Sequence, residues 1–225
     1  MITLALDAST QVGTVAVLRD RTLLAEGEAV MRGEWEERLM PAVAATLGQA
    51  GCSVRDVTRV ICGAGPGSFT SLRIAGAIAK GIVVGNGARV EGLFAVSSLA
   101  LIVAGRAAHL EAGRWLALLD AMRGERYAAL FEVGGDGSVR EIERLGRVRE
   151  GDVSLECERL GARAIGPREM VDAAPHARGA AILLDGILVH GRVPLDSWEP
   201  EYGRLAEAQV KWETVHGRSL PGDAK

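Results

Sequence analysis

Cysteine and aromatic residues are both scarce in this chain of 225 residues. The three cysteines are Cys52, Cys62 and Cys157. Because their number is odd and their spacing is wide, they form neither a disulfide framework nor a C-x-x-C metal pair. This cysteine usage favours a reducing compartment, so we expect a cytoplasmic protein. Aromatic residues make up 4% of the chain, and the core must therefore be built mainly from Ala, Val, Leu and Ile.

An excess of positive charge is also absent. The chain has 26 Lys and Arg residues against 29 Asp and Glu residues, which gives a net charge of −3 at pH 7. Neither residues 1–105 nor residues 106–225 are basic. A protein that binds nucleic acid by itself neutralises phosphates with Lys and Arg. The composition therefore argues against a stand-alone nucleic-acid binder, although a partner could supply the charge.

Long hydrophobic runs are missing as well. The longest stretch without a charged residue is Leu39–Val54, 16 residues that are interrupted by Pro41 and two glycines. A helix that spans a bilayer needs about 20 apolar residues, so we expect no membrane span. The chain begins directly with a strand pattern and shows no basic leader or cleavage site, so no secretory signal is expected.

The first 105 residues contain a clear order of strands and helices. Short connections between three strand-like runs predict an antiparallel meander, made of Ile2–Asp7, Gly13–Leu18 and Thr22–Val30. Apolar residues at helical spacing predict a helix over 34–50, which Pro41 should kink or start. Strand, helix, strand and helix patterns follow at 57–62, 68–84, 89–94 and 97–104. A doubly wound dinucleotide fold alternates from its first strand, so this order differs from it.

The second part of the chain is less clearly patterned. Runs at 115–120 and 125–133 predict two strands separated by a short turn, and a final helix is expected over 204–214. Charged residues are frequent after Arg140, and no element is predicted between that residue and the final helix. We place a domain boundary near Gly105, with domains at 1–105 and 106–203.

The glycine-rich run Gly63–Gly67 lies between a predicted strand and a predicted helix. Glycines at such a place let the backbone pass close to another group, and the N-terminus of a helix favours an anion. However, a phosphate-binding P-loop needs a Lys that is absent here, and the third glycine comes one residue too early for G-x-G-x-x-G. The run is either a tight turn that packs the helix on the sheet or an anion or nucleotide contact.

The segment Asp7-Ala8-Ser9-Thr10 follows the first predicted strand. In actin-like and sugar-kinase-like ATPases, an acidic residue followed by small and hydroxyl residues at this place meets phosphate and metal. The alternative is that Asp7 and Ser9 only bond the backbone of the turn.

No other constellation predicts chemistry. The four histidines are far apart and form no H-x-x-x-H or H-E-x-x-H pair. A G-x-S-x-G elbow for a nucleophilic serine is also absent. We therefore predict no catalytic residue, no metal site and no cofactor.

The predicted helix over 68–84 carries two apolar stripes. One contains Leu72, Ala75, Gly76, Ala79 and Val83, and the other contains Ile74, Ile78 and Ile82. Since a helix needs only one stripe to cover a sheet, two stripes indicate burial on both sides. The small residues of the first stripe allow another helix to approach closely. We favour a helix-to-helix subunit contact, and burial under the second domain is the alternative.

Four segments together resemble the TsaB (YeaZ) family: Leu6-Asp7-Ala8-Ser9-Thr10, Glu37-Arg38-Leu39-Met40-Pro41, Gly65-Pro66-Gly67-Ser68-Phe69-Thr70-Ser71-Leu72-Arg73 and Asp120-Ala121-Met122-Arg123-Gly124-Glu125-Arg126-Tyr127. The resemblance covers residues 1–133 well, and Gly-Pro-Gly-Ser-Phe-Thr is highly specific. Within these segments, the motif residues without an assigned role are Asp7, Ser9, Thr10, Gly65, Pro66, Gly67, Ser68 and Arg73.

The resemblance implies an actin-like ATPase (ASKHA) fold, which is an α/β fold of two related βββαβα-type subdomains with mixed sheets. It also implies that the helix over 204–214 packs back on the first subdomain. In this family TsaB carries out no chemistry. It binds its catalytic paralogue TsaD and works with the ATPase TsaE to make threonylcarbamoyladenosine beside the tRNA anticodon. The tRNA is then met only through the complex.

The resemblance places the partner surface on the helices over 34–50 and 68–84, which pair with TsaD, or with a second copy when TsaD is absent. The residues expected there are Trp35, Leu39, Val43, Leu72, Ala75, Gly76, Ala79 and Val83. A second hypothesis remains open, in which the chain is a nucleotide-dependent small kinase or hydrolase that uses Asp7 and the glycine-rich run. Hydrolysis of ATP by the purified chain would distinguish the two.

Overall fold

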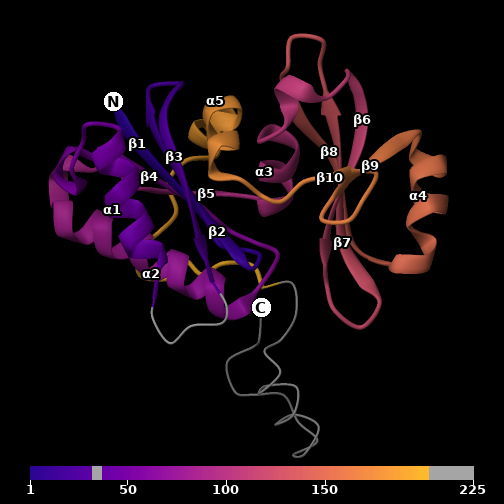
Figure 1. Ribbon diagram of the computed structural model, residues 1–225, viewed down its shortest axis with the longest axis horizontal. Helices are drawn as coiled ribbons and strands as arrows, with labels where there is room; N and C mark the ends of the chain where they lie inside the picture. The colour runs from indigo at the N-terminus through magenta and orange to yellow at the C-terminus, as the bar shows by residue number, and fades with distance from the viewer. Residues whose placement is uncertain (32–36, 203–225) are drawn as a thin grey trace, which may run out of the picture.

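The computed structural model describes residues 1–31 and 37–202, which form two five-stranded sheets placed side by side (Figure 1). The first sheet contains β1 (Ile2–Asp7), β2 (Val12–Arg19), β3 (Thr22–Val30), β4 (Arg59–Gly63) and β5 (Leu93–Val96). The second contains β6 (Gly113–Asp120), β7 (Glu125–Val133), β8 (Val139–Arg149), β9 (Ala162–Gly166) and β10 (Val171–Asp172). Their strand orders are β3-β2-β1-β4-β5 and β10-β9-β6-β7-β8.

Within the described residues, five helices cover the sheets: α1 (Leu39–Gln49), α2 (Phe69–Asn86), α3 (Ser98–Ala104), α4 (Val153–Leu160) and α5 (Ala180–His190). Short 3-10 turns lie at Val54–Asp56, Gly87–Arg89, Ala107–His109, Glu150–Asp152 and Ala177–Gly179. Within the described part of the chain, no helix is both long and apolar enough to cross a bilayer.

Both sheets are mixed. In the first, β2 pairs antiparallel with β1 and β3, whereas β4 and β5 run parallel to β1. The predicted meander at the start of the chain is therefore confirmed. The second sheet repeats this arrangement. Strand β7 is antiparallel to both β6 and β8, whereas β9 is parallel to β6. The molecule has the actin-like ATPase fold that the family resemblance implies.

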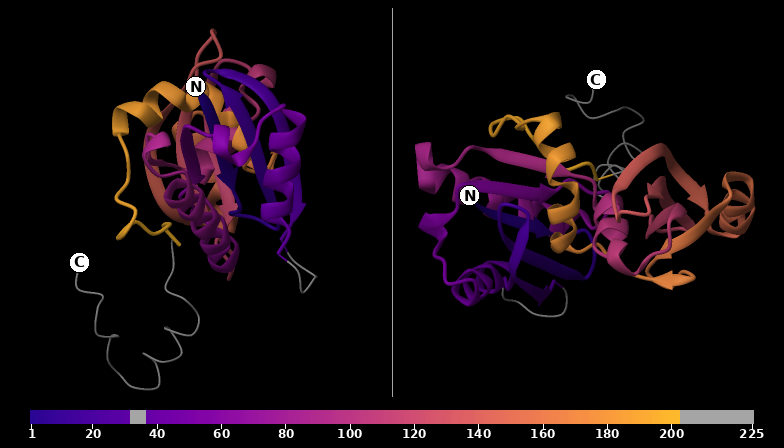
Figure 2. Two further views of the ribbon diagram at one scale, coloured as in Figure 1. Left: turned by 90° about the vertical axis from the view of Figure 1, so that its left-hand side faces the viewer. Right: turned by 90° about the horizontal axis from the view of Figure 1, so that it is seen from above.

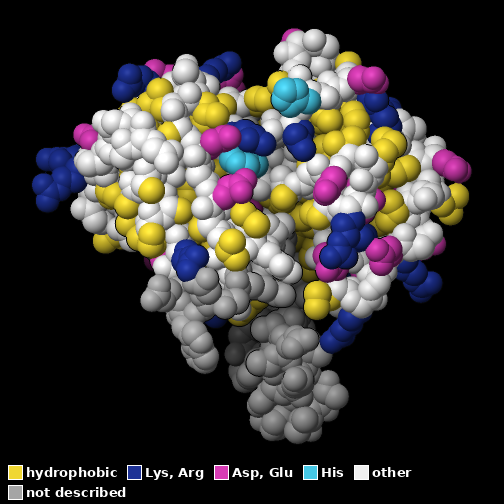
Figure 3. Space-filling model, viewed as in Figure 1, with side chains coloured by type: hydrophobic (Ala, Val, Ile, Leu, Met, Phe, Trp, Pro, Cys, Tyr) yellow, Lys and Arg dark blue, Asp and Glu magenta, His cyan; other side chains and the backbone are white. Residues whose placement is uncertain are grey.

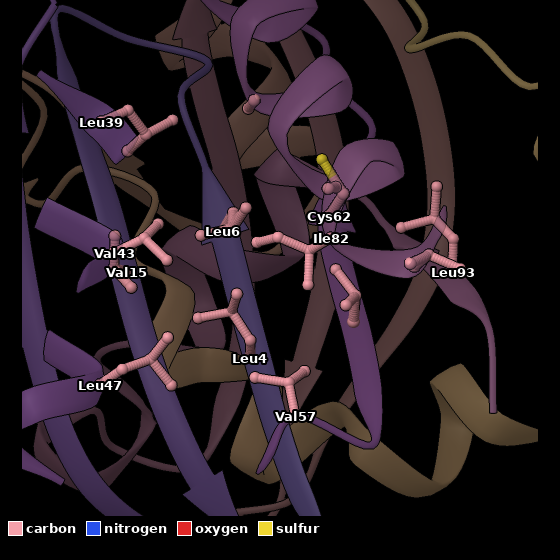
Figure 4. Packing of buried hydrophobic residues seen from close by; sticks show 14 of the residues in the cluster. Leu4, Leu6, Val15, Leu39, Val43, Leu47, Val57, Cys62, Ile82 and Leu93 are labelled. Atoms are coloured by element: carbon pink, nitrogen blue, oxygen red, sulfur yellow. The ribbon is translucent and has the colours of Figure 1, made fainter. Parts of the chain in front are cut away.

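Except at the edge strand β3, the first sheet is buried on both faces. On one face, α1 and α2 pack on the strands through a cluster that includes Leu4, Leu6, Val15, Leu39, Val43, Leu47, Ala79 and Ile82 (Figure 4). On the other face lies α5, whose Ala180, Leu184 and Ile187 pack against Ala5 and Ile61 (Figure 2). Because each face is covered by helices, strands β1, β2 and β4 are almost entirely apolar and buried.

The two halves exchange a helix. Although α3 follows the last strand of the first sheet, its residues Leu99, Ile102 and Val103 pack on the second sheet against β6 and β7. In turn, α5 follows the last strand of the second sheet but packs on the first. Each half therefore completes the core of the other, and both helices lie between the sheets (Figure 1).

Several predicted elements need correction. Residues 34–36 of the helix expected over 34–50 lie outside the described residues, and within those that are described the helix begins at Leu39. The Glu37 carboxylate accepts hydrogen bonds from the N–H groups of Leu39 and Met40, which have no partner within the helix. Pro41 consequently lies in the first turn, where its missing N–H costs nothing. The strand expected over 89–94 is instead Leu93–Val96, since residues 87–89 form a 3-10 turn. The helix expected over 204–214 lies outside the described residues.

Candidate functional site

The glycine-rich run connects β4 to α2 and lies beside the end of β1. Three backbone donors in the run and just after it are already used by the protein. The N–H of Ala64 donates to the Val96 carbonyl at 2.7 Å, and that of Ser68 donates to the Ser9 carbonyl at 2.8 Å. The N–H of Gly65 donates to Ser98 Oγ at 3.2 Å. A phosphate-binding loop points such groups at its ligand, so these three donors cannot serve a phosphate in this structure.

The glycines of this run are needed for close packing. Gly65 has φ of +90°, and a Cβ there would overlap the carbonyl oxygen of Glu201. A Cβ on Gly67 would overlap the carbonyl oxygen of Ser9. Both glycines thus admit other segments of the same chain. This arrangement supports the interpretation of the run as a packing turn over that of a nucleotide contact.

Asp7, the last residue of β1, is 1% exposed. Its carboxylate accepts hydrogen bonds from Ser98 Oγ at 2.5 Å, from Ser9 Oγ at 2.7 Å and from the Ser9 N–H at 2.9 Å. Burial raises the pKa of this carboxyl, while the serine hydrogen bonds act in the opposite direction. Thr10 Oγ1 donates to the Val12 carbonyl at 3.1 Å. The polar groups of the motif are therefore directed at the turn and at the glycine-rich run.

A segment whose sequence resembles the family's Pro-x-Tyr-Leu-Arg, but whose position the sequence does not predict, lies across this site. We name residues 198–202 the crossing segment. The N–H of Glu201 donates to the Ala64 carbonyl at 2.6 Å, and the Tyr202 ring lies 4.3 Å from that of Phe69 at the start of α2. From the second sheet, Tyr127 Oη donates to the Tyr202 carbonyl at 3.2 Å. The crossing segment thus covers the glycine-rich run and ties it to the other half of the molecule. Its signal in the sequence is Pro200-Glu201-Tyr202.

The residues predicted for the partner surface lie mostly inside the first half. Leu39, Val43, Leu72, Ala75 and Ala79 are completely buried, and Val83 is 6% exposed. Gly76 faces Trp198 and Pro200 of the crossing segment, and Trp35 lies outside the described residues. The six described side chains are thus buried within the chain itself, and their contact with a partner stays a prediction. The stripe faces the core because the sheet lies directly beneath it.

Another face of the same two helices is open. Its residues are Met40, Ala44, Ala45 and Gly48 of α1 and Thr70, Arg73, Ala77, Gly81, Val84 and Gly85 of α2. We name this set the exposed helix face. A Cβ on Gly48, Gly81 or Gly85 would meet no atom within 4 Å. Arg73 lies over the Phe69 ring at 5.3 Å, at the edge next to the glycine-rich run. The face is mainly composed of small residues.

The described residues also contain no group of three or more His, Cys, Asp and Glu side chains that is arranged to hold a metal ion. Cys62 is buried beside Asp7, and burial strongly raises the pKa of its thiol. A thiol in such a place is a poor nucleophile, because the thiolate is the reactive form.

Comparisons with known proteins agree with this architecture. Residues 30–144 match the family model described as TsaD: tRNA N6-adenosine threonylcarbamoyltransferase. The TsaB protein of Bacillus subtilis is 29% identical over 94% of this chain and 98% of its own length. The TsaB protein of Escherichia coli is 36% identical over 60% of this chain and 56% of its own length.

Two solved structures from Pseudomonas aeruginosa share the fold. One, described as similar to the peptidase YeaZ, has a TM-score of 0.72 and 26% identity, and the match covers 90% of this chain and 99% of that one. The other, YeaZ itself, has a TM-score of 0.69 and 25% identity over 89% of this chain and 99% of its own. The motifs, the repeated mixed sheets and these matches agree, and the chain belongs to the TsaB (YeaZ) family.

Proposed function

We propose that this chain is a non-catalytic subunit of the cytoplasmic machinery that makes threonylcarbamoyladenosine in tRNA. In this role it binds the catalytic paralogue TsaD and works with TsaE. The names of the Bacillus subtilis and Escherichia coli relatives, tRNA threonylcarbamoyladenosine biosynthesis protein TsaB, support the pathway. The match to the TsaD family model supports a paralogous relationship to the partner.

The non-catalytic role is supported mainly by one observation: the glycine-rich run is already covered and hydrogen-bonded by other parts of the same chain. In an active kinase or hydrolase of this fold class, Asp7 and the loop N–H groups would have to face the nucleotide. Here Asp7 is buried against Ser9 and Ser98, and the crossing segment lies on the loop. A nucleotide would first have to displace the crossing segment and release these internal hydrogen bonds.

The exposed helix face is the surface that suits a helical partner. Small residues allow the backbones of two helices to come close, which increases the area that packs between them. Val84 is 69% exposed and Met40 is 36% exposed, so the face also offers apolar side chains that a partner would remove from water. In the absence of TsaD, a second copy of the chain would bind at the same face.

The surface is tested by size-exclusion chromatography of the chain with TsaD from the same organism. The native chain should co-elute with TsaD at micromolar concentration. Ala77→Arg places a charge in the middle of the exposed helix face and should weaken association by about a hundredfold, since desolvating an unpaired charge costs several kcal/mol. Val189→Arg on α5, where the native valine is 86% exposed, is the matched control and should co-elute normally.

The outcomes separate the surface from the function. If Ala77→Arg still co-elutes like the native chain, the surface is misplaced. If the native chain itself fails to co-elute, the proposed role as a TsaD-binding subunit is wrong. Calorimetry with Mg²⁺-ATP should show no micromolar site on the isolated chain, and a tight site with turnover would favour the kinase or hydrolase hypothesis.

A further inference from the structure

The second half carries a depression of about 580 Å³ at the turn between β6 and β7. Its walls come from Arg123 and Gly124 of this turn, from Arg147 and Arg149 of β8, and from Gly151 and Asp152 just after β8, with Glu125 at the start of β7. Every lining residue is charged or is glycine. A surface that buries a protein partner usually needs apolar or aromatic anchors at its centre, and this depression offers none.

Strand register brings the arginines together. Arg149 pairs with Glu125 and Arg147 pairs with Tyr127 across the β7–β8 ladder. Directly opposite residues in an antiparallel pair point to the same side of the sheet. Tyr127 is buried in the cluster that contains α3, so Arg147 and Arg149 project from the side of the sheet that α3 covers. On that side, Arg144 reaches the crossing segment through Glu201 at 3.3 Å.

The depression keeps uncompensated positive charge. Arg147 forms an ion pair with Glu125 at 3.1 Å. Arg123 and Arg149, both exposed, have no hydrogen-bond or ion-pair partner within the part of the chain that the structure describes. Asp152 is the remaining acidic side chain in the lining. Among the lining residues, three guanidinium groups therefore face two carboxylates. On the face of the molecule drawn in Figure 3, by contrast, acidic and basic side chains are interspersed.

The turn holds Arg123 in a defined position. Met122, Arg123 and Gly124 have φ values of +63°, +56° and +72°. Two successive non-glycine residues with positive φ are uncommon, because the side chain crowds the backbone there. The turn is fixed from both ends: the Met122 N–H donates to Asp120 Oδ1 at 2.7 Å, and the Glu150 N–H donates to the Gly124 carbonyl at 2.8 Å.

We propose that this depression binds phosphates of an RNA backbone, with Arg123 and Arg149 as the principal donors. This proposal rests on the proposed function, which supplies tRNA as the polyanion. A guanidinium group matches a phosphate with two parallel N–H donors, and phosphate oxygens accept a large share of the hydrogen bonds that proteins make to nucleic acids. Gly124 and Gly151 leave room for the backbone to approach. With so few phosphates contacted, the affinity is weak for the chain alone and adds to that of its partner in a complex.

The test uses the full chain alone with an unmodified tRNA transcript at about 50 mM salt, where phosphate contacts are strongest. The double variant Arg123→Gln with Arg149→Gln should lose about tenfold in affinity. Its dependence of log K on log salt should also become shallower by about one to two units, as expected for two lost phosphate contacts. The control pairs Arg19→Gln with Arg55→Gln, two exposed arginines of the first half, and removes the same charge. It should change affinity less than threefold.

Equal losses in both double variants would mean that only net charge matters, and an unchanged affinity in the first would mean that its arginines do not contact RNA. Either result overturns the proposal. If the Arg123→Gln, Arg149→Gln variant no longer binds inorganic phosphate but still binds tRNA with native affinity, the site serves a small anion and the proposal is also overturned. Both double variants should still co-elute with TsaD. Loss of tRNA binding with retained co-elution supports this inference, whereas failure of co-elution by the native chain concerns only the proposed function.

Discussion

The two halves of the molecule share one strand plan but differ at a single connection. When each sheet is followed from the outer strand of its antiparallel meander, the order β3-β2-β1-β4-β5 corresponds to β8-β7-β6-β9-β10, with the same parallel and antiparallel pairs. Between β4 and β5 lie the glycine-rich run and α2, whereas β9 and β10 are joined by residues 167–170 alone. The second half therefore has no counterpart of α2, and the exposed helix face belongs only to the first half.

The correspondence extends to single residues. Asp7 and Asp120 end the first strand of their sheets, and each is followed by a buried alanine. Each carboxylate accepts a hydrogen bond from the N–H two residues later, Ser9 in one half and Met122 in the other. However, Asp7 is buried and Asp120 is exposed. The same turn thus serves the packed core in the first half, and in the second half it supports the exposed arginine turn.

The largest expected effect comes from α2, the element that only the first half has. Ala79 is completely buried in the core beneath α2. Ala79→Arg would bury an unpaired charge and extra volume, which costs several kcal/mol. The melting temperature followed by circular dichroism should fall by about 10 °C or more. Ala77→Arg, two residues earlier and exposed, should melt within about 2 °C of the native chain. If the two variants melt alike, the assignment of these faces to core and surface is wrong.

Much of the first half was predictable from the sequence because its patterns are strong. The meander and the position of α2 follow from strand-length apolar runs and from a long helical pattern, and both are confirmed. The sequence did not show in the same way which of the two apolar stripes of α2 packs on the sheet and which is left for a partner. Leu72, Ala75 and Ala79 form as good an apolar stripe as Ile74 and Ile78, and periodicity does not say which stripe meets the sheet. The structure shows that the first stripe is covered by the sheet and, at Gly76, by the crossing segment.

The second half was predicted poorly for a physical reason. In β8, register shifts near Ala128 and Phe131 of the partner strand interrupt the alternation of side chains, and most of the strand is exposed and charged. A pattern of period two therefore does not appear in its sequence. The helix α5 carries apolar residues on several sides, since Ala180, Leu184 and Ile187 are buried while Ile182 and Val189 are exposed, so it lacks the one-sided stripe that marks a surface helix. The arginine depression depends on the first of these features, because Arg147 and Arg149 come from β8.

The next effect compares two glycines with positive φ, one in each half. Gly65 has φ of +90° and lies against Glu201, while Gly124 has φ of +72° and no atom within 4 Å of a Cβ position. Gly124→Ala should cost about 1 kcal/mol through backbone strain alone. Gly65→Ala should cost about 3 kcal/mol, because it adds overlap with the crossing segment to the same strain. Urea unfolding measures both free energies. Equal costs would show that the crossing segment gives way without loss.

The smallest effect concerns the corresponding carboxylates. Burial raises the pKa of Asp7 in the folded state above its usual range. Between the unfolded and folded pKa values, the folded state holds more protons, so the stabilising contribution of Asp7 is complete below about pH 4 and is lost as the pH rises through the folded value. Asp7→Asn removes this titration. As the pH rises from 4.5 to 7.5, the native chain should therefore lose stability relative to the Asp7→Asn variant.

Asp120→Asn is the matched control in the second half. The Asn side-chain oxygen can still accept from the Met122 N–H, and the site is exposed, so this variant should stay within about 1 kcal/mol of the native chain at every pH. Urea unfolding at four pH values between 4.5 and 7.5 compares the two variants. The comparison between the halves holds if only Asp7→Asn changes its offset from the native chain with pH. If the difference in free energy of unfolding between Asp7→Asn and the native chain does not change with pH, the Asp7 carboxyl has the same protonation in the folded and unfolded states. Its burial among Ser9 and Ser98 would then not distinguish it from the exposed Asp120.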